Sequence, residues 1–174
     1  MQLAGEDIRL RAVEPGDIDA MYRWENDPAL WEGDTLHEPL SRHALERFVE
    51  EQRYDIFQTR QQRLIIERMK DERTMGCVDL FEVEPLHCRA GVGIVIYPTE
   101  ERRKGYASEA LRLLEGYAQE SLRMHQLWCD VAVGNTASRA LFRKAGYEEA
   151  GRKRDWVWMA EGGYCDTLTL QKIF

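Results

Sequence analysis

Residues 92–108 read Val-Gly-Ile-Val-Ile-Tyr-Pro-Thr-Glu-Glu-Arg-Arg-Lys-Gly-Tyr-Ala-Ser, an apolar run that gives way to a short basic segment. The apolar part is typical of a buried β-strand, and Pro98 ends it. After the basic segment, apolar residues recur at the three- and four-residue spacing of an amphipathic helix, namely Ala107, Ala110, Leu111, Leu114, Ala118 and Leu122. The stretch therefore predicts a strand, a tight loop and a long helix in direct succession.

Further elements are expected on both sides of this stretch. Alternating or continuous apolar runs predict strands at residues 8–13, 63–68, 75–83, 127–133, 156–159 and 167–170. Helices are expected after Asp17, after the N-cap candidate Ser41, and between Asn135 and Gly146. The order β-α-α-β-β-β-α-β-α-β-β predicts a mixed sheet covered by helices on both faces. The length of 174 residues fits a single domain, 1–174, with one buried core.

The composition is that of an ordinary soluble globular protein, with 44% hydrophobic and 32% charged residues. A net charge of −7 argues against nucleic acid as a partner and favours cationic partners. No apolar run approaches the roughly 20 residues that span a membrane, and the acidic N-terminal segment argues against a secretory signal. The widely spaced cysteines are Cys77, Cys88, Cys129 and Cys165, with no CxxC pair. Reduced thiols in a cytoplasmic protein without a structural metal are therefore expected.

The loop before the long helix reads Arg-x-x-Gly-x-Ala from Arg102 to Ala107. Its small residues let the backbone approach a ligand, and the first turn of a helix offers unpaired N–H groups with a partial positive charge. Arg102, Arg103 and Lys104 add cationic donors, so the segment is suited to a diphosphate. It is neither a Walker loop nor a GxGxxG fingerprint. Taken alone, it is equally consistent with a plain strand-to-helix connection whose basic residues are solvated.

A second motif lies about one strand further on. From Asn135 to Tyr147 it reads Asn-Thr-Ala-Ser-Arg-Ala-Leu-Phe-Arg-Lys-Ala-Gly-Tyr. Together the two segments resemble the acetyl-CoA site of the GCN5-related N-acetyltransferase (GNAT) superfamily. Its signature is Arg/Gln-x-x-Gly-x-Gly/Ala, then Asn-x-x-Ala/Ser-x-x-Leu/Ile-Tyr/Phe-x-Lys-x-Gly-Phe. The run Gly163-Tyr164-Cys165-Asp166 and residues 8–11 resemble the branch that contains ribosomal-protein alanine and spermidine N-acetyltransferases.

This resemblance covers essentially the whole chain. It implies an α+β fold whose twisted sheet is mostly antiparallel. It also implies an enzyme that moves an acetyl group from acetyl-CoA to a primary amine, on a polyamine or on a protein or peptide N-terminus. The amine is expected to attack directly in a ternary complex, without a covalent enzyme intermediate.

The resemblance also assigns acetyl-CoA-binding residues by position. The backbone of Val95, Ile96 and Tyr97 is expected to run beside the pantetheine arm, with one N–H group polarising the thioester carbonyl. The residues expected to wrap the diphosphate are Arg102, Arg103, Lys104, Gly105, Tyr106, Ala107 and Ser108. The remaining cosubstrate-binding residues are Asn135, Ser138 and Phe142, with Phe142 near the sulfur. Asn135 is equally well explained as a helix cap.

One residue departs from the pattern of this branch. Phe142 stands where the branch usually has the tyrosine that protonates the leaving thiol, and phenylalanine has no proton to give. Water, Tyr97, Tyr147 and His87 are the alternative donors. A thiol pKa of roughly 8.5 also allows the thiolate to leave without one. The general acid is therefore not assigned.

No general base is assigned either. Glu82 and Glu84 are expected to share one strand face by alternation, but a solvated surface explains them at least as well, and Asp79 is expected to point the other way. The residues expected to bind the acceptor are Trp31, Glu32, Asp34 and Glu82, because carboxylates beside an indole suit an ammonium group. A surface loop with anchoring tryptophans explains residues 26–40 equally well. Trp156 and Trp158 are expected either to line the acceptor cleft or to pack in the core or at a dimer interface.

Three functions from different classes therefore stay open. The first is an active N-acetyltransferase for small amines or peptide N-termini. The second is a non-catalytic acetyl-CoA sensor, which the loss of the tyrosine at Phe142 favours. The third is an interaction protein on the same fold. A homo-oligomer is compatible with each of them.

Overall fold

The computed structural model describes residues 3–27, 38–159 and 162–174. Its strands are β1 (Ile8–Ala12), β2 (Gln62–Arg68), β3 (Arg73–Glu84), β4 (Arg89–Ile96), β5 (Gln126–Ala132), β6 (Glu148–Met159) and β7 (Gly163–Ile173). Its helices are α1 (Ile18–Glu25), α2 (Arg42–Glu51), α3 (Ile56–Thr59), α4 (Tyr106–Glu120) and α5 (Thr136–Lys144). The 3-10 turns are η1 (Pro15–Asp17) and η3 (Thr99–Glu101).

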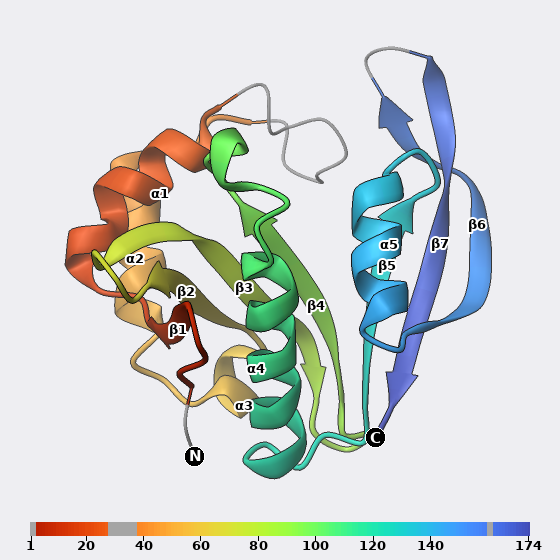
Figure 1. The fold of residues 1–174 in the computed structure, drawn as a ribbon, viewed down its shortest axis with the longest axis horizontal. Coiled ribbons are helices and arrows are strands. Elements are labelled where there is room, and N and C mark those ends of the chain that lie inside the picture. Colours follow the sequence, from red (N-terminus) through yellow and green to blue (C-terminus); the bar gives the residue numbers. More distant parts are fainter. Residues whose placement is uncertain (1–2, 28–37, 160–161) are drawn as a thin grey trace.

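These strands form one sheet in the order β1-β2-β3-β4-β5-β7-β6. Neighbouring strands are antiparallel, except that β4 and β5 run parallel. The parallel pair is joined by the crossover helix α4, because a parallel connection needs a dozen or more residues. The mixed, mostly antiparallel sheet expected from the sequence is therefore confirmed (Figure 1).

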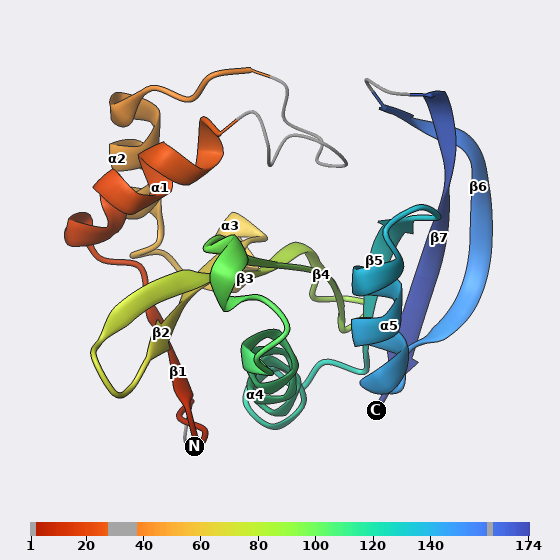
Figure 2. The ribbon, with the colours of Figure 1, turned by 45° about the horizontal axis from the view of Figure 1, so that its top comes forward.

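Helices cover both faces of the sheet (Figure 2). Alternation along β2 shows how: Leu64 and Ile66 belong to the larger core cluster, whereas Ile65 packs on the opposite face with Met21 of α1 and Leu45 of α2. The larger cluster contains the buried face of α4, whose Ala110, Leu111, Leu114 and Ala118 are fully buried. Burial of each leucine contributes about 1.5–3 kcal/mol, so α4 is held firmly against the sheet, and its first turn has a defined place.

Two elements differ from the prediction. Strand β6 begins at Glu148, eight residues before the expected start, because its pairing with β7 does not require apolar side chains. The short helix α3 was not expected; the Asp55 side chain caps it by accepting the N–H of Phe57 at 2.6 Å. Strand pairing therefore decides the first of these elements and helix capping the second, and neither depends on hydrophobic periodicity.

All four cysteines are free. Burial raises the pKa of the Cys77 and Cys129 thiols to about 12, so both stay protonated near neutral pH and cannot act as thiolate nucleophiles. Among the described residues, no helix combines the length and apolarity needed to cross a membrane.

Candidate active site

Strands β4 and β5 lie together for only part of their length (Figure 1). They pair at three positions, which join Arg89 to Gln126, Ala90 to Leu127 and Gly91 to Trp128. Beyond Gly91, β4 continues to Ile96 along β3, and β5 continues to Ala132 along β7. Residues 92–96 of β4 and 129–132 of β5 are therefore separated by a gap between the two strands, which we call the parting. The backbone groups along its two edges have no partner on the opposite strand. Such an edge can receive an extended amide-containing ligand as an extra strand.

The register with β3 decides which N–H groups of β4 face this parting. Tyr97, directly after β4, donates its N–H to the carbonyl of Met75 in β3 at 3.0 Å. Hydrogen-bonding directions alternate along an antiparallel strand, so Val95 also bonds toward β3, whereas Ile94 and Ile96 direct their N–H groups toward β5. Of the three backbone positions expected beside the pantetheine arm, Ile96 alone presents its N–H group there. Ile94 is a second donor that the sequence did not reveal, because no local motif records the register.

The loop after β4 is wound back onto the end of the strand. Arg102 donates its Nε to the carbonyl of Ile96 at 2.8 Å, and its backbone N–H bonds to the Thr99 carbonyl at 3.2 Å. The Arg102 side chain therefore helps to shape the loop. Its two Nη atoms are the donors that can still reach an anion.

Gly105 is the N-cap of α4 and has φ 95° and ψ −15°, a left-handed conformation that favours glycine. A Cβ added there would meet no protein atom within 4 Å, so the space above the helix start is open. The N–H groups of Tyr106, Ala107 and Ser108 lie in the first turn and have no acceptor within the helix. The Tyr106 ring is buried in the core, so this residue can offer a ligand only its backbone. A bare first turn beneath open space is suited to an anion.

Helix α5 places the second motif. Asn135 is its N-cap, and its Oδ1 accepts the N–H of Ser138 at 3.0 Å, so the helix-cap role is confirmed. Phe142 is only 3% exposed and packs edge-to-face against Tyr147, with ring centroids 5.0 Å apart. The residue that replaces the branch's tyrosine therefore has a core-packing role in this chain.

The alternative proton donors are poorly suited to the task. The Tyr97 ring stacks on Trp24 at 4.0 Å, and its hydroxyl lies 4.0 Å from the Cys77 sulfur. Burial raises the pKa of both Tyr97 and Tyr147, so their phenols hold their protons tightly. His87 lies in the turn before β4, at the paired end of β4 and β5, and the eight residues of β4 put about 23 Å between that end and Ile96.

A charged cluster lies beside the parting, on the sheet face that α1 and α2 cover. Asp79 is opposite Gly93 in the β3–β4 register, and it holds Arg63 through two contacts of 2.8 and 2.9 Å. Arg63 also contacts Glu25 of α1 at 2.5 Å. Burial disfavours the charged form of Arg63. The carboxylates of Asp79 and Glu25 favour it more strongly than burial opposes it, and the pKa of Arg63 is held well above its usual range. With two carboxylates and one guanidinium, the cluster carries a formal charge of −1.

An aromatic pair lies on the same face of the sheet, at the level of Gly91, where β4 and β5 separate. The rings of Phe81 and Trp128 meet edge-to-face at 5.5 Å, from β3 and β5 respectively. Phe81 lies over Gly91, where an added Cβ would come within 2.5 Å of the ring. Gly91 is thus required for this close approach, and both aromatic side chains are half-buried beside the Asp79 cluster.

The inference about Glu82 and Glu84 needs correction. A β-bulge interrupts the β3–β4 register between Phe81 and Glu84, and Glu82 itself has φ 47°, so the regular alternation on which the shared face rested is wrong. Glu84 is paired with Arg60. Asp79, set aside on the sequence, lies nearer to the parted strands. The acceptor-binding candidates Trp31, Glu32 and Asp34 lie outside the described residues.

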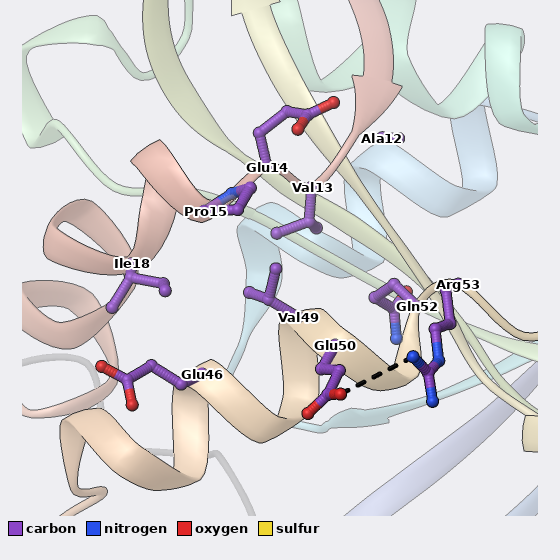
Figure 3. A pocket seen from close by; sticks show the side chains of 10 residues that line it. All are labelled: Ala12, Val13, Glu14, Pro15, Ile18, Glu46, Val49, Glu50, Gln52 and Arg53. Carbon is purple, nitrogen blue, oxygen red and sulfur yellow. Dashed lines mark ion pairs between the residues drawn. The ribbon is translucent and has the colours of Figure 1, made fainter.

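A surface cavity of about 540 Å³ lies elsewhere, between the end of β1 and α2. Val13, Ile18 and Val49 form its apolar wall, and Glu50 and Arg53 pair at its rim (Figure 3). None of the residues expected to bind the cosubstrate or the acceptor lines this cavity.

Comparisons with known proteins agree with this geometry. The family model described as "Acetyltransferase (GNAT) domain" matches residues 7–148. A spermidine N(1)-acetyltransferase of Vibrio cholerae is 26% identical over 147 residues, which are 83% of this chain and 80% of the relative. A crystal structure of spermidine N-acetyltransferase from Vibrio cholerae in complex with CoA and spermine superimposes with a TM-score of 0.85 at 25% identity, covering 97% of this chain and 96% of that one.

A second structure of the Vibrio cholerae enzyme, described as dodecameric and in an intermediate state, has a TM-score of 0.81 at 25% identity. It covers 97% of this chain and 95% of that chain. The family model spans both predicted motifs and most of the sheet. The chain therefore belongs to the GNAT acetyltransferase family, and it is an N-acetyltransferase.

Proposed function

We propose that the chain transfers an acetyl group from acetyl-CoA to a primary amine of a polyamine of the spermidine class. The observation that carries the proposal is the parting of β4 and β5 directly before the bare first turn of α4. In CoA, the pantetheine arm is an extended amide-containing chain that is joined to a diphosphate. The parted edge suits the chain, and the helix start suits the diphosphate.

The proposed chemistry needs little from side chains. The amine nitrogen forms a bond to the carbonyl carbon, the carbon–sulfur bond breaks, and the proton of the amine goes to solvent or to a base. The N–H of Ile96 is the donor best placed to stabilise the carbonyl oxygen as it gains charge. Because a thiolate is a tolerable leaving group, loss of the tyrosine at Phe142 lowers the rate without removing the reaction.

Charge and aromatic surface support a cationic acceptor. The chain has a net charge of −7, and the carboxylates of Asp79 and Glu25 lie with Arg63 beside the parted strands. The half-buried Phe81 and Trp128 rings can pack against methylene groups and attract an ammonium. Spermine occupies the relative's complex with CoA, which agrees with an acceptor of this class.

An acceptor screen tests the proposal. Purified protein is mixed with acetyl-CoA and with spermidine, spermine, putrescine, N-terminal peptides or an aminoglycoside, and released CoA thiol is measured. We expect turnover with spermidine and spermine and much less with the peptides. Calorimetry with CoA runs in parallel. Binding of CoA without turnover for any amine would instead support the acetyl-CoA sensor.

Phe142→Tyr should raise kcat about tenfold while the KM for acetyl-CoA stays within twofold. The change restores a hydroxyl at the family's proton-donor position without removing a packing ring. The matched control is Tyr147→Phe, which removes the neighbouring hydroxyl and should leave kcat unchanged. An unaltered kcat in a folded Phe142→Tyr protein would show that this hydroxyl does not reach the sulfur.

We also propose that the chain self-associates through the outer end of the β6–β7 hairpin. Trp158 lies opposite Tyr164 across the hairpin, and Trp156 lies two residues earlier on the same strand. These side chains are 55%, 67% and 60% exposed, and β6 is an edge strand. Exposed aromatics along an unpaired edge are typical of an interface, and the dodecameric relative agrees with a second copy as the partner.

Trp158→Glu should therefore shift the protein to a smaller species in light scattering coupled to size-exclusion chromatography. A buried carboxylate with no counterion opposes association. Tyr54→Ser, at an aromatic that is also exposed but lies next to α2, is the matched control and should leave the mass unchanged. A wild-type monomer, or a variant of unchanged mass, would exclude this surface as the interface.

A further inference from the structure

A buried carboxylate lies within the loop that is expected to bind phosphate. Glu101 ends η3, one residue before Arg102, and its side chain is only 9% exposed. It contacts Arg68 Nη1 at 3.0 Å, Lys104 Nζ at 2.8 Å and Arg73 Nη1 at 3.4 Å. A negative charge beside an anionic ligand opposes binding. Glu101 therefore needs another reason to be there.

Arg68 provides the reason, because it joins the loop to the sheet. It is the last residue of β2, and its side chain is 8% exposed. Its guanidinium binds both carboxylate oxygens of Asp71 in the β2–β3 turn, at 2.8 and 2.6 Å, and lowers the pKa of Asp71 to about 2. The same guanidinium reaches Glu101 and also interacts with the Tyr106 phenol at the start of α4. One buried side chain thus holds three segments together.

The loop has few other ties of this kind. In the described part of the chain, the hydrogen bonds and ion pairs from side chains of residues 99–104 to positions outside residues 96–109 end on Arg68 and Arg73. The loop also contains Arg103 at φ 63°, a left-handed conformation that costs a non-glycine residue about 1 kcal/mol or more. Such a backbone persists only where surrounding contacts maintain it.

We propose that Glu101 and Arg68 are a positioning pair that holds the phosphate loop in the shape that receives the diphosphate of acetyl-CoA. The inference rests on the proposed cosubstrate. Neither side chain needs to touch the ligand: Arg68 holds Glu101, and Glu101 holds the loop and Lys104. The pair favours binding by holding the loop in place, although the negative charge of Glu101 by itself opposes an anionic ligand.

The substitution Glu101→Gln separates the two effects by sign. Loss of a negative charge near the diphosphate should by itself tighten acetyl-CoA binding. Release of the loop from Arg68 should weaken it, because the backbone N–H groups and Lys104 lose their places. The positioning pair predicts the second result, with Kd for CoA and KM for acetyl-CoA raised about tenfold. This ratio corresponds to about 1.4 kcal/mol.

The experiment compares Glu101→Gln with Glu100→Gln, a matched loss of charge one residue earlier. Glu100 is exposed, and among the described residues its side chain pairs with Arg73 alone, at 3.4 Å, so its substitution should leave Kd unchanged or lower it. Binding of CoA is measured by calorimetry, and kinetics are measured with acetyl-CoA and with S-acetylpantetheine, which has no diphosphate. Glu101→Gln should impair the reaction with acetyl-CoA and leave kcat/KM for S-acetylpantetheine within twofold.

Arg68 variants complete the test. Arg68→Met should raise Kd like Glu101→Gln, and the double variant should be no worse than either single variant, because one broken contact already releases the loop. Arg68→Lys keeps the charge and should recover part of the affinity; it also serves where Arg68→Met folds poorly. Melting temperatures check that each variant is folded.

Unchanged or tighter CoA binding by Glu101→Gln would overturn the inference, as would an equal loss of activity with both thioesters, which would indicate a general disturbance of the fold. These results differ from failure of the proposed function. In that case the wild-type protein itself would not bind CoA, and the positioning pair would fall with it.

Discussion

Gly105→Val should lower kcat/KM for acetyl-CoA by more than about 100-fold, the largest effect of any single change that we expect in the cosubstrate site. Gly105 adopts φ 95°, where an L-residue costs roughly 1–2 kcal/mol and a β-branched one more. Its Cβ would also project into the open space above the first turn of α4, on the path of the diphosphate. Strain and obstruction therefore act in the same direction.

The matched control is Gly116→Ala within α4. An added Cβ there also meets open space, but Gly116 does not have positive φ. Helix propensity should make this variant about 0.5–1 kcal/mol more stable, with unchanged kinetics. Steady-state kinetics with acetyl-CoA and urea unfolding check both variants. Activity of Gly105→Val within tenfold of the wild type would contradict a ligand at this turn.

Arg63→Met should lower the free energy of unfolding by about 3–5 kcal/mol. This is the largest loss of stability that we expect from breaking an ion pair in this protein. Arg63 lies against Phe48 of α2, with its guanidinium 5.3 Å from the ring centroid, and it is the counterion of both Asp79 and Glu25. Methionine keeps much of the volume but leaves two carboxylates close together at a partly buried site.

Arg42→Met is the control for the loss of a charge from an ion pair. Arg42 pairs with Asp19 between α1 and α2, but both side chains are exposed, so little change in stability is expected. Urea unfolding with a common m-value measures both variants. A loss below about 1 kcal/mol for Arg63→Met would show that the two carboxylates do not depend on Arg63 for their stability.

The two charged clusters have different consequences for function. The Arg63 cluster lies beside the parted strands, so its loss should affect the acceptor amine as well as stability. The Arg68 cluster lies at the loop before α4, so its loss should affect the diphosphate. Separate KM values for the amine and for acetyl-CoA therefore distinguish them.

Several features could be predicted from the sequence because they depend on neighbours along the chain. The apolar stripe of Ala110 and Leu114 predicted α4, and Asn135 predicted the cap of α5. Each depends on interactions within about four residues, which the order of residues displays directly.

Other features could not be predicted, because their partners are remote in the sequence. The first part of β6, residues 148–155, is polar and mostly exposed, so it has no apolar pattern from which a strand could be predicted. The contact between Glu101 and Arg68 joins residues 33 positions apart, and neither residue carries a local sign of burial. Asp79 was set aside by strand alternation, whereas its closeness to the parted strands follows from the β3–β4 register.

By itself, the sequence determined the order of the seven strands and of the helices α1, α2, α4 and α5, the basic loop with its glycine before α4, and the absence of a tyrosine at Phe142, because backbone preference and side-chain chemistry are local properties. Only the tertiary structure decided that β4 and β5 separate after Gly91, that Ile94 and Ile96 face the parting, and that Arg68 holds the loop. These depend on which strand pairs with which and in what register, and the whole core decides that pairing through the free energy of burial.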